Sequence, residues 1–358
     1  MRKPVATQRP IRLARTDRTR AGSTALGMIQ LFAGLVLLAG LAGAAGLALA
    51  HIRASVLAYR SPVSAQPASL GHNTTPLADQ VVIVAIAGLR AEAIPDMPTL
   101  QQLARQGATA RVVPSLPGDS QAQCTTLVSG SPPELSGAPL LDVPEEQIRP
   151  LAVDTIFAAA QRAGLTTAVV GLPAWGRLIS TTTLSAHYSG QGPASEADQA
   201  AAEAACRYLR SFRPHLLLVQ FQGLSDAARQ QGESSPAYRQ AARAIDDHLR
   251  DISASIDWHN AVLLVTSCPN SFGSSATPGA GTPLVLAGPA VVGGDHATVS
   301  PVDIAPTVCA LLGAPMPRAS TGRVLFCMLS ANPYKLAETQ VEVALQRREH
   351  ATLYLRSI

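Results

Sequence analysis

The longest apolar stretch of the chain lies near its N-terminus. Residues 24–50 carry no charged side chain, and Gln30 is the one strongly polar residue among them. An α-helix rises 1.5 Å per residue, so about 20 residues cross the roughly 30 Å hydrocarbon core of a bilayer. The pattern predicts a transmembrane helix over residues 24–50, and then a linker over residues 51–78 that is rich in Ser, Pro, Asn and Thr.

Beyond the linker, short apolar runs alternate with segments of helical character. The runs that favour strands are residues 81–86, 110–113, 167–170, 216–221, 261–266 and 283–287. The segments that favour helices are residues 98–106, 154–163, 196–210, 236–256 and 303–312, with Asp154 and Asp303 as capping residues, and a C-terminal helical tail over residues 331–358. This alternation predicts an α/β domain over residues 79–330, a doubly wound and mainly parallel sheet sandwiched by helices. Such sheets bind ligands beyond the carboxyl ends of their strands.

Charge is distributed unevenly and bears on topology. The formal net charge is +4, but seven Arg and Lys residues lie within the basic tail of residues 1–23, opposed there only by Asp17. The remainder has no basic stripe, so nucleic-acid binding is not expected. The positive-inside rule predicts a cytoplasmic N-terminus, a single-pass anchor in the cell membrane and an extracytoplasmic main domain. The alternative is a cleaved signal peptide ending at Ala50, although the apolar run is about twice a typical signal core.

The five cysteines show no metal-binding spacing. They are Cys124, Cys206, Cys268, Cys309 and Cys327, with no C-x-x-C pair among them. An odd count rules out a complete set of intrachain disulfides, and isolated buried thiols are the favoured interpretation, with a Cys309–Cys327 pair as the alternative.

Five segments of the predicted domain resemble, in order, the type I phosphodiesterase/nucleotide pyrophosphatase branch of the alkaline phosphatase superfamily. Those segments are V-V-I-V-A-I-A-G-L-R at residues 81–90, T-T-L-V-S-G at 125–130 with P-P-E-L-S-G at 132–137, residues 216–239, V-L-L-V-T-S at 262–267, and residues 302–325. The resemblance implies the superfamily fold. It also implies a site in which carboxylates and histidines hold two divalent metals, usually zinc, that activate a Ser or Thr nucleophile.

Placed one by one, the family's site residues fall mostly on side chains that cannot perform their roles. The metal-ligand positions fall on Ala87, Ser225, Arg229, Cys268 and Pro269, while the last histidine ligand has no match, His296 being the nearest. The nucleophile position falls on Ser120, and the family's phosphate-contacting Asn is replaced by Gln123.

The resemblance therefore implies a pseudoenzyme with no metal cofactor, acting as a structural or interaction subunit with a protein partner, anchored to the membrane by its N-terminal helix. One alternative is an active phosphodiesterase or phosphatase in which Asp119 and Asp226 hold a displaced zinc or other divalent metal. Another is an anion-binding module that uses Arg90 and Arg229, because guanidinium groups bind phosphate bidentately.

Overall fold

The computed structural model describes residues 18–59, 71–113, 120–138, 147–180, 182–268 and 281–357. The chain divides into two compact units, Met1–Ala58 and Tyr59–Ile358.

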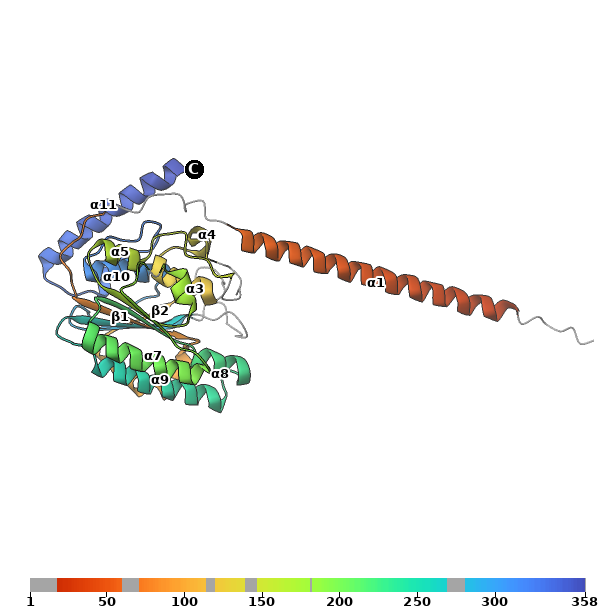
Figure 1. The fold of residues 1–358 in the computed structure, drawn as a ribbon, viewed down its shortest axis with the longest axis horizontal. Coiled ribbons are helices and arrows are strands. Elements are labelled where there is room, and N and C mark those ends of the chain that lie inside the picture. The colour runs from red at the N-terminus through yellow and green to blue at the C-terminus, as the bar shows by residue number, and fades with distance from the viewer. Residues whose placement is uncertain are drawn as a thin grey trace, which may run out of the picture. The chain divides into compact units, whose positions relative to one another are not determined.

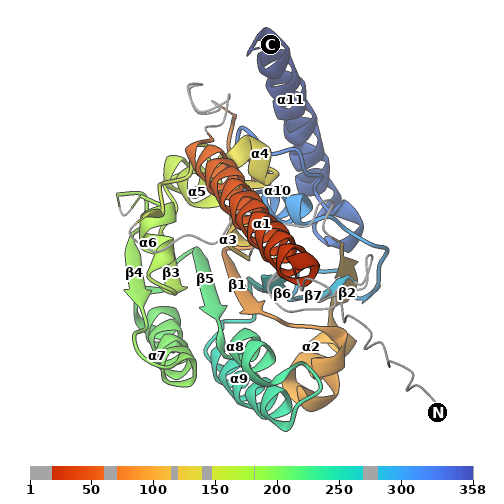
Figure 2. The same ribbon diagram turned by 90° about the vertical axis from the view of Figure 1, so that its right-hand side faces the viewer.

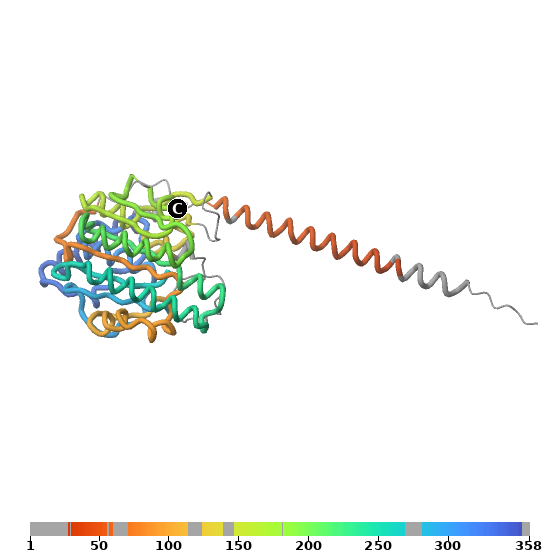
Figure 3. Tube along the Cα trace, turned by 60° about the horizontal axis from the view of Figure 1, so that its bottom comes forward, coloured from red at the N-terminus to blue at the C-terminus, as the bar shows by residue number. Residues whose placement is uncertain are grey.

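The first unit is one long helix, α1 (Arg18–Ala58), whose coloured part Figure 3 shows as a continuous coil. Its stretch Gln30–Ser55 is long and apolar enough to cross a membrane, with a mean hydropathy of 2.2. Large apolar side chains on it face outward, and Leu31 and Phe32 are each 70% exposed. The helix extends at both ends beyond the predicted span of residues 24–50.

The second unit is built on an eight-stranded sheet. Figure 2 shows its strands side by side, from β4 on the left to β2 on the right. Its strands are β1 (Gln80–Ala87), β2 (Ala108–Val112), β3 (Thr167–Gly171), β4 (Ala186–Ser189), β5 (Leu216–Phe221), β6 (Ala261–Cys268), β7 (Thr282–Ala287) and β8 (Gly294–Asp295). Their order is β4-β3-β5-β1-β6-β7-β2-β8. β1 lies at the centre and pairs in parallel with β5 and β6, whereas β7 runs antiparallel to both of its neighbours. The predicted α/β class and mainly parallel sheet are confirmed.

Helices cover both faces of this sheet, as Figure 1 shows. The α-helices of the unit are α2 (Pro98–Gln106), α3 (Ser120–Ser129), α4 (Pro133–Ser136), α5 (Ile156–Arg162), α6 (Ala174–Leu178), α7 (Ala194–Arg207), α8 (Gly223–Gln231), α9 (Pro236–Ala254), α10 (Ile304–Leu312) and α11 (Pro333–Ser357). Short helices of other types are η1 (Ala91–Asp96), η3 (Tyr208–Phe212), η4 (Pro301–Asp303) and η5 (Phe326–Met328).

Alternate side chains of the central strand enter different layers. Val82, Val84 and Ile86 belong to the core cluster that β1 shares with α2, α7 and α9. Because successive side chains of a strand point to opposite faces, Ala87 is directed toward the other layer, where α3 contacts β6 and α10 contacts β1. All of β1 from Val81 onward is buried, which explains its unbroken apolar sequence.

Helix boundaries follow local sequence signals, with two corrections. α2 spans Pro98–Gln106 as predicted, with proline in its first turn. α5 is capped by Thr155, whose hydroxyl accepts a hydrogen bond from the N–H of Ala158, rather than by Asp154. Asp154 instead forms an ion pair with Arg162 at 2.6 Å. Asp303 stands at the N-cap position of α10 but makes no side-chain capping bond to that helix. Its carboxylate instead accepts a hydrogen bond from the N–H of Ser300 at 2.9 Å, in the capping box of η4.

Candidate functional site at the carboxyl ends of the central strands

Three of the predicted ligand positions meet where the central strands end. Ala87 is the last residue of β1 and lies opposite Cys268, the last residue of β6, in the register of the two strands. Ser225 lies on α8, which follows β5, the other neighbour of β1. The turn after β1 touches it closely, because a Cβ atom added to Gly88 would lie 2.9 Å from the Cα of Ser225. Sequence segments far apart in the chain thus converge at one edge of the sheet.

Cys268 forms a disulfide with Cys124 of α3, with the two Cα atoms 5.3 Å apart. The expectation of an isolated buried thiol at Cys268 is therefore wrong. Cys206, Cys309 and Cys327 are free, so the alternative of a Cys309–Cys327 pair is also wrong. The bonded cysteines are 144 residues apart in sequence and carry no characteristic spacing, so only the folded chain reveals the pair.

A chain of polar contacts runs from this disulfide along the α3 side of the sheet. Gln220, near the end of β5, directs its amide nitrogen toward the sulfur of Cys124 at 3.8 Å. Its amide oxygen accepts a hydrogen bond from the indole N–H of Trp175. Gln220 and Trp175 are both buried, so these contacts satisfy groups that water does not reach.

Ser225 is buried, and its backbone lies close against the turn at Gly88. Its side-chain hydroxyl is buried and has no hydrogen-bond partner within the described part of the chain. The adjacent turn is held from the other side by Tyr238 of α9, whose hydroxyl donates to the carbonyl of Gly88 at 2.9 Å. Burial of Tyr238 is the main cause that raises the pKa of its phenol. The hydroxyl therefore stays protonated and acts as a donor.

The two arginines of the predicted anion pocket both contact carboxylates. The Nε atom of Arg90 lies 2.9 Å from Glu233, and Arg229 pairs with Asp226 one turn earlier on α8. An anion would have to compete with these acidic partners. The anion-pocket hypothesis stays a prediction.

Several predicted residues fall outside this cluster or outside what the structure describes. Pro269 and Asp119 lie outside the described residues, and Ser120 and Gln123 are described only as backbone at the start of α3. His296 follows the edge strand β8, three strands away from β6 in the sheet. Its ring contacts the carbonyl of Val292, and the residue is half-buried.

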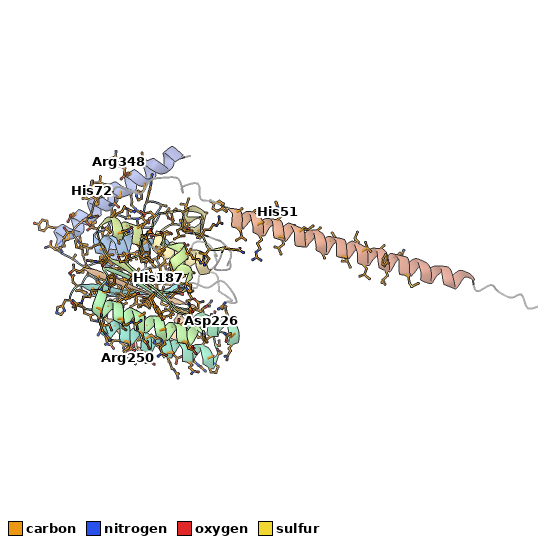
Figure 4. The ribbon with its side chains drawn as sticks, viewed as in Figure 1. His51, His72, His187, Asp226, Arg250 and Arg348 are labelled. Atoms are coloured by element: carbon orange, nitrogen blue, oxygen red, sulfur yellow. A yellow bond between two sulfur atoms is a disulfide. The ribbon has the colours of Figure 1, made fainter. Side chains whose placement is uncertain are left out.

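A pocket of about 630 Å³ opens beside the cluster, at the carboxyl ends of β3, β4 and β5. Among the described residues that line it, the charged ones are both acidic, Asp198 and Asp226. Figure 4 labels Asp226, which α8 carries in its first turn. Gln220 and Gln222 add amide groups to the lining. Sequence reasoning weighed Asp226 only as a replacement metal ligand and did not single out Asp198.

Asp198 of α7 caps the N-terminus of α8 from outside that helix. Its two carboxylate oxygens accept hydrogen bonds from the N–H groups of Gln222 at 2.9 Å and Gly223 at 2.7 Å. Burial raises the pKa of Asp198 to about 6, while the two hydrogen bonds act in the opposite direction. The sequence did contain a signal for Asp198, because an acidic residue on the buried face of an Ala-rich helix needs a polar partner.

The residues at the strand ends do not suit the two metal ions of the superfamily. Ala87 offers no donor atom, the sulfur of Cys268 is bonded to Cys124, and Arg229 is cationic. Among the described residues, no group of three or more His, Cys, Asp or Glu side chains is arranged to hold a metal. No catalytic step through a metal is therefore derived for this chain.

Comparison with known proteins gives a fold relationship. No family model and no curated protein matches the chain in sequence. Among solved structures, murine ectonucleotide pyrophosphatase/phosphodiesterase 5, as an inactive variant in complex with AMP, aligns with a TM-score of 0.57 at 13% identity over 70% of this chain and 100% of that chain. The 2-O glycosaminoglycan sulfatase BT1596 aligns with a TM-score of 0.58 at 14% identity, over 70% and 73% of the two chains. An alkaline phosphatase superfamily protein from Vibrio parahaemolyticus aligns at 0.53 and 16%, over 72% of each chain.

Proposed function

We propose that this chain, whose fold is that of the alkaline phosphatase superfamily, is a membrane-anchored pseudoenzyme that acts as a structural or interaction subunit. The observation that carries the proposal is the Cys124–Cys268 disulfide at the strand end where a metal-ligand pair is expected. A disulfide sulfur does not act as the thiolate that binds a metal. The fold alone does not fix a function, so the proposal depends on these site residues.

Loss of the neighbouring ligands supports the same conclusion. Changing a single group around a metal typically lowers affinity or activity about 10- to 100-fold. Here Ala87 is apolar, Ser225 offers only a neutral hydroxyl, and Arg229 is engaged with Asp226. Several such losses together would leave a metal ion without a site. The nucleophile position, Ser120, would then keep the very high pKa of an ordinary hydroxyl.

The anchor supports a role at the membrane. Seven basic residues precede the apolar stretch of α1, which orients the N-terminus toward the cytoplasm by the positive-inside rule. The α/β unit would then lie outside the cytoplasm, where disulfides form and persist. A tethered domain that catalyses no reaction would act through contacts made by its surface. We therefore infer a protein partner within a membrane complex.

The pocket beside the strand ends favours one competing function. Asp198 and Asp226 both line it, and two carboxylates are the beginning of a hard-cation site. An active metal-dependent phosphodiesterase would use such a displaced site. Against this, both oxygens of Asp198 already cap α8 and Asp226 pairs with Arg229.

Metal content and hydrolysis separate the two functions. The full-length chain, purified in detergent, is expected to contain no stoichiometric divalent metal by plasma mass spectrometry. It should hydrolyse bis-p-nitrophenyl phosphate no faster than buffer does with added zinc, magnesium or manganese. Ser120→Ala should change nothing, and Asp226→Asn serves as the matched test of the displaced site. Metal-dependent turnover that is lost in either variant would overturn the pseudoenzyme proposal.

The interaction role has its own experiment. The tagged full-length chain is purified from detergent-solubilised membranes after brief chemical cross-linking, with an unrelated single-pass membrane protein as control. A stoichiometric co-purifying protein, absent from the control, is the expected result. A chain that runs alone as a monodisperse species before and after cross-linking would argue against a subunit role.

A further inference from the structure

The two cysteines of the disulfide belong to the two chain segments that an active relative would join through metal. Cys124 lies on α3, the helix that begins at the nucleophile position Ser120. Cys268 ends β6 and is itself the first of the two neighbouring ligand positions expected there. In a metal site of this type the ions contact both the nucleophile and the strand-end ligands, and so they tie the helix to the sheet.

In this chain the covalent bond lies where that connection is expected. Cys124 is 5% exposed and Cys268 is 1% exposed, so the bond is enclosed between α3 and the sheet. Ala87 lies beside it on β1, and the amide of Gln220 approaches it from β5. The described residues thus surround a disulfide with apolar and neutral polar groups rather than with metal ligands.

We propose that the Cys124–Cys268 disulfide replaces the metal ions as the cross-link that completes this fold. Stability of the α/β unit then depends on oxidation and is independent of divalent metals. The bond forms when the two thiols lose two protons and two electrons to a small-molecule or protein disulfide, which leaves as two thiols. Because both sulfurs are buried, the bond is expected to resist exchange in the folded chain and to form during folding outside the cytoplasm.

The cross-link is expected to stabilise the folded α/β unit substantially. Closing a loop between residues separated by 144 positions removes much of the conformational freedom of the unfolded chain. For a domain of this size the loss of such a bond should lower the melting temperature by about 10 °C. A long loop is where a chain-entropy effect is greatest.

Thiol counting tests the bond itself. The full-length chain, purified without reductant, is alkylated in denaturant before and after reduction, and the modified cysteines are identified by mass spectrometry. Three alkylated cysteines before reduction and five afterwards are expected, with the peptides of Cys124 and Cys268 linked in the first sample. Five alkylated cysteines in the unreduced sample would overturn the proposal.

Thermal unfolding tests the function of the bond. A wild-type chain reduced in denaturant and refolded in reductant should melt about 10 °C lower than the oxidised chain, while EDTA should leave the melting temperature of the oxidised chain unchanged. The double variant Cys124→Ala/Cys268→Ala should melt low under both conditions and show no further effect of reductant. Cys327→Ala, which removes an exposed free thiol, should respond to reductant as wild type does.

The outcomes distinguish this inference from the proposed function on which it rests. Destabilisation by EDTA would show that metal ions hold the fold, and would overturn the inference. An equal reductant response in the double variant would do the same, and thiol counting on the wild type decides the matter if the double variant does not fold. Failure of the pseudoenzyme proposal is detected separately, by metal-dependent hydrolysis.

Discussion

Ala87 and Cys268 lie opposite each other at the last paired position of β1 and β6. One carries no functional group and the other is bonded to Cys124 on α3. Two positions expected to face a common pair of metal ions are therefore occupied by a methyl group and a disulfide. This pairing is the structural basis of the predictions that concern catalysis.

Restoring one ligand should not restore activity. In Ala87→Asp a carboxylate enters a position that is 1% exposed, opposite a disulfide-bonded cysteine, and its burial costs several kcal/mol unless it is protonated. We expect no zinc binding by calorimetric titration, no hydrolysis of bis-p-nitrophenyl phosphate, and a lower melting temperature. Ala87→Asn, similar in size and uncharged, is the control for the charge. Stoichiometric zinc binding by Ala87→Asp alone would contradict the conclusion that the remaining ligand positions cannot hold a metal ion.

Gly88 should be intolerant of a side chain for two separable reasons. Its φ of +78° is rarely adopted by other residues, and an added Cβ would lie 2.9 Å from the backbone of Ser225. Gly164 is a matched control, because its φ is +76° and an added Cβ meets nothing within 4 Å. In urea unfolding, Gly164→Ala should cost about 1 kcal/mol and Gly88→Ala at least about 2 kcal/mol more. Equal losses in the two variants would mean that the turn does not press on α8.

Asp198 should make stability fall as pH rises from about 4 to about 6. Its pKa is raised by burial to about 6 from an ordinary 3.8, so in this window the native chain binds more protons than the unfolded chain. The resulting loss, about 3 kcal/mol, is complete near pH 7, one unit above the folded-state pKa. In Asp198→Asn this part of the pH dependence should vanish. The check is the difference in free energy of unfolding between wild type and variant at pH 4 and pH 7, and a pH-independent difference would contradict the assignment.

The N-terminal segment should stay on the mature protein. Because the apolar stretch Gln30–Ser55 is long and basic residues precede it, the chain should remain in the pellet after alkaline carbonate extraction. A chain beginning at Tyr59 is the soluble control, since it corresponds to the second compact unit. Mass-spectrometric detection of a mature N-terminus near His51 would instead establish a cleaved signal peptide.

Elements with strong local signals were predictable from the sequence. α2 begins at Pro98 and ends before Gly107, and β5 spans Leu216–Phe221 as its apolar run indicates. These segments combine buried periodicity with clear terminating residues, so local physics and tertiary structure agree. The order of the motifs likewise indicates the superfamily fold from the sequence alone.

Features that depend on distant partners were not predictable. The Cys124–Cys268 bond forms only because two segments 144 residues apart meet in the fold, and no hydrophobic periodicity along the chain indicates that contact. Asp198 caps a helix that begins 25 residues later, at Gly223, so neither segment alone indicates the contact. The same holds for the antiparallel direction of β7, because an apolar run does not indicate in which direction its strand lies beside its neighbours.

The central position of β1 has a consequence for biosynthesis. β1 is the first strand of the sheet to leave the ribosome, yet its two neighbours are β5 and β6, made much later. Until β5 (Leu216–Phe221) and β6 (Ala261–Cys268) have been synthesised, both hydrogen-bonding edges of the apolar strand β1 are unpaired. Open apolar edges invite aggregation. β1 is therefore the strand of the unfinished sheet that stays longest exposed to wrong pairing, until β5 and β6 complete the centre.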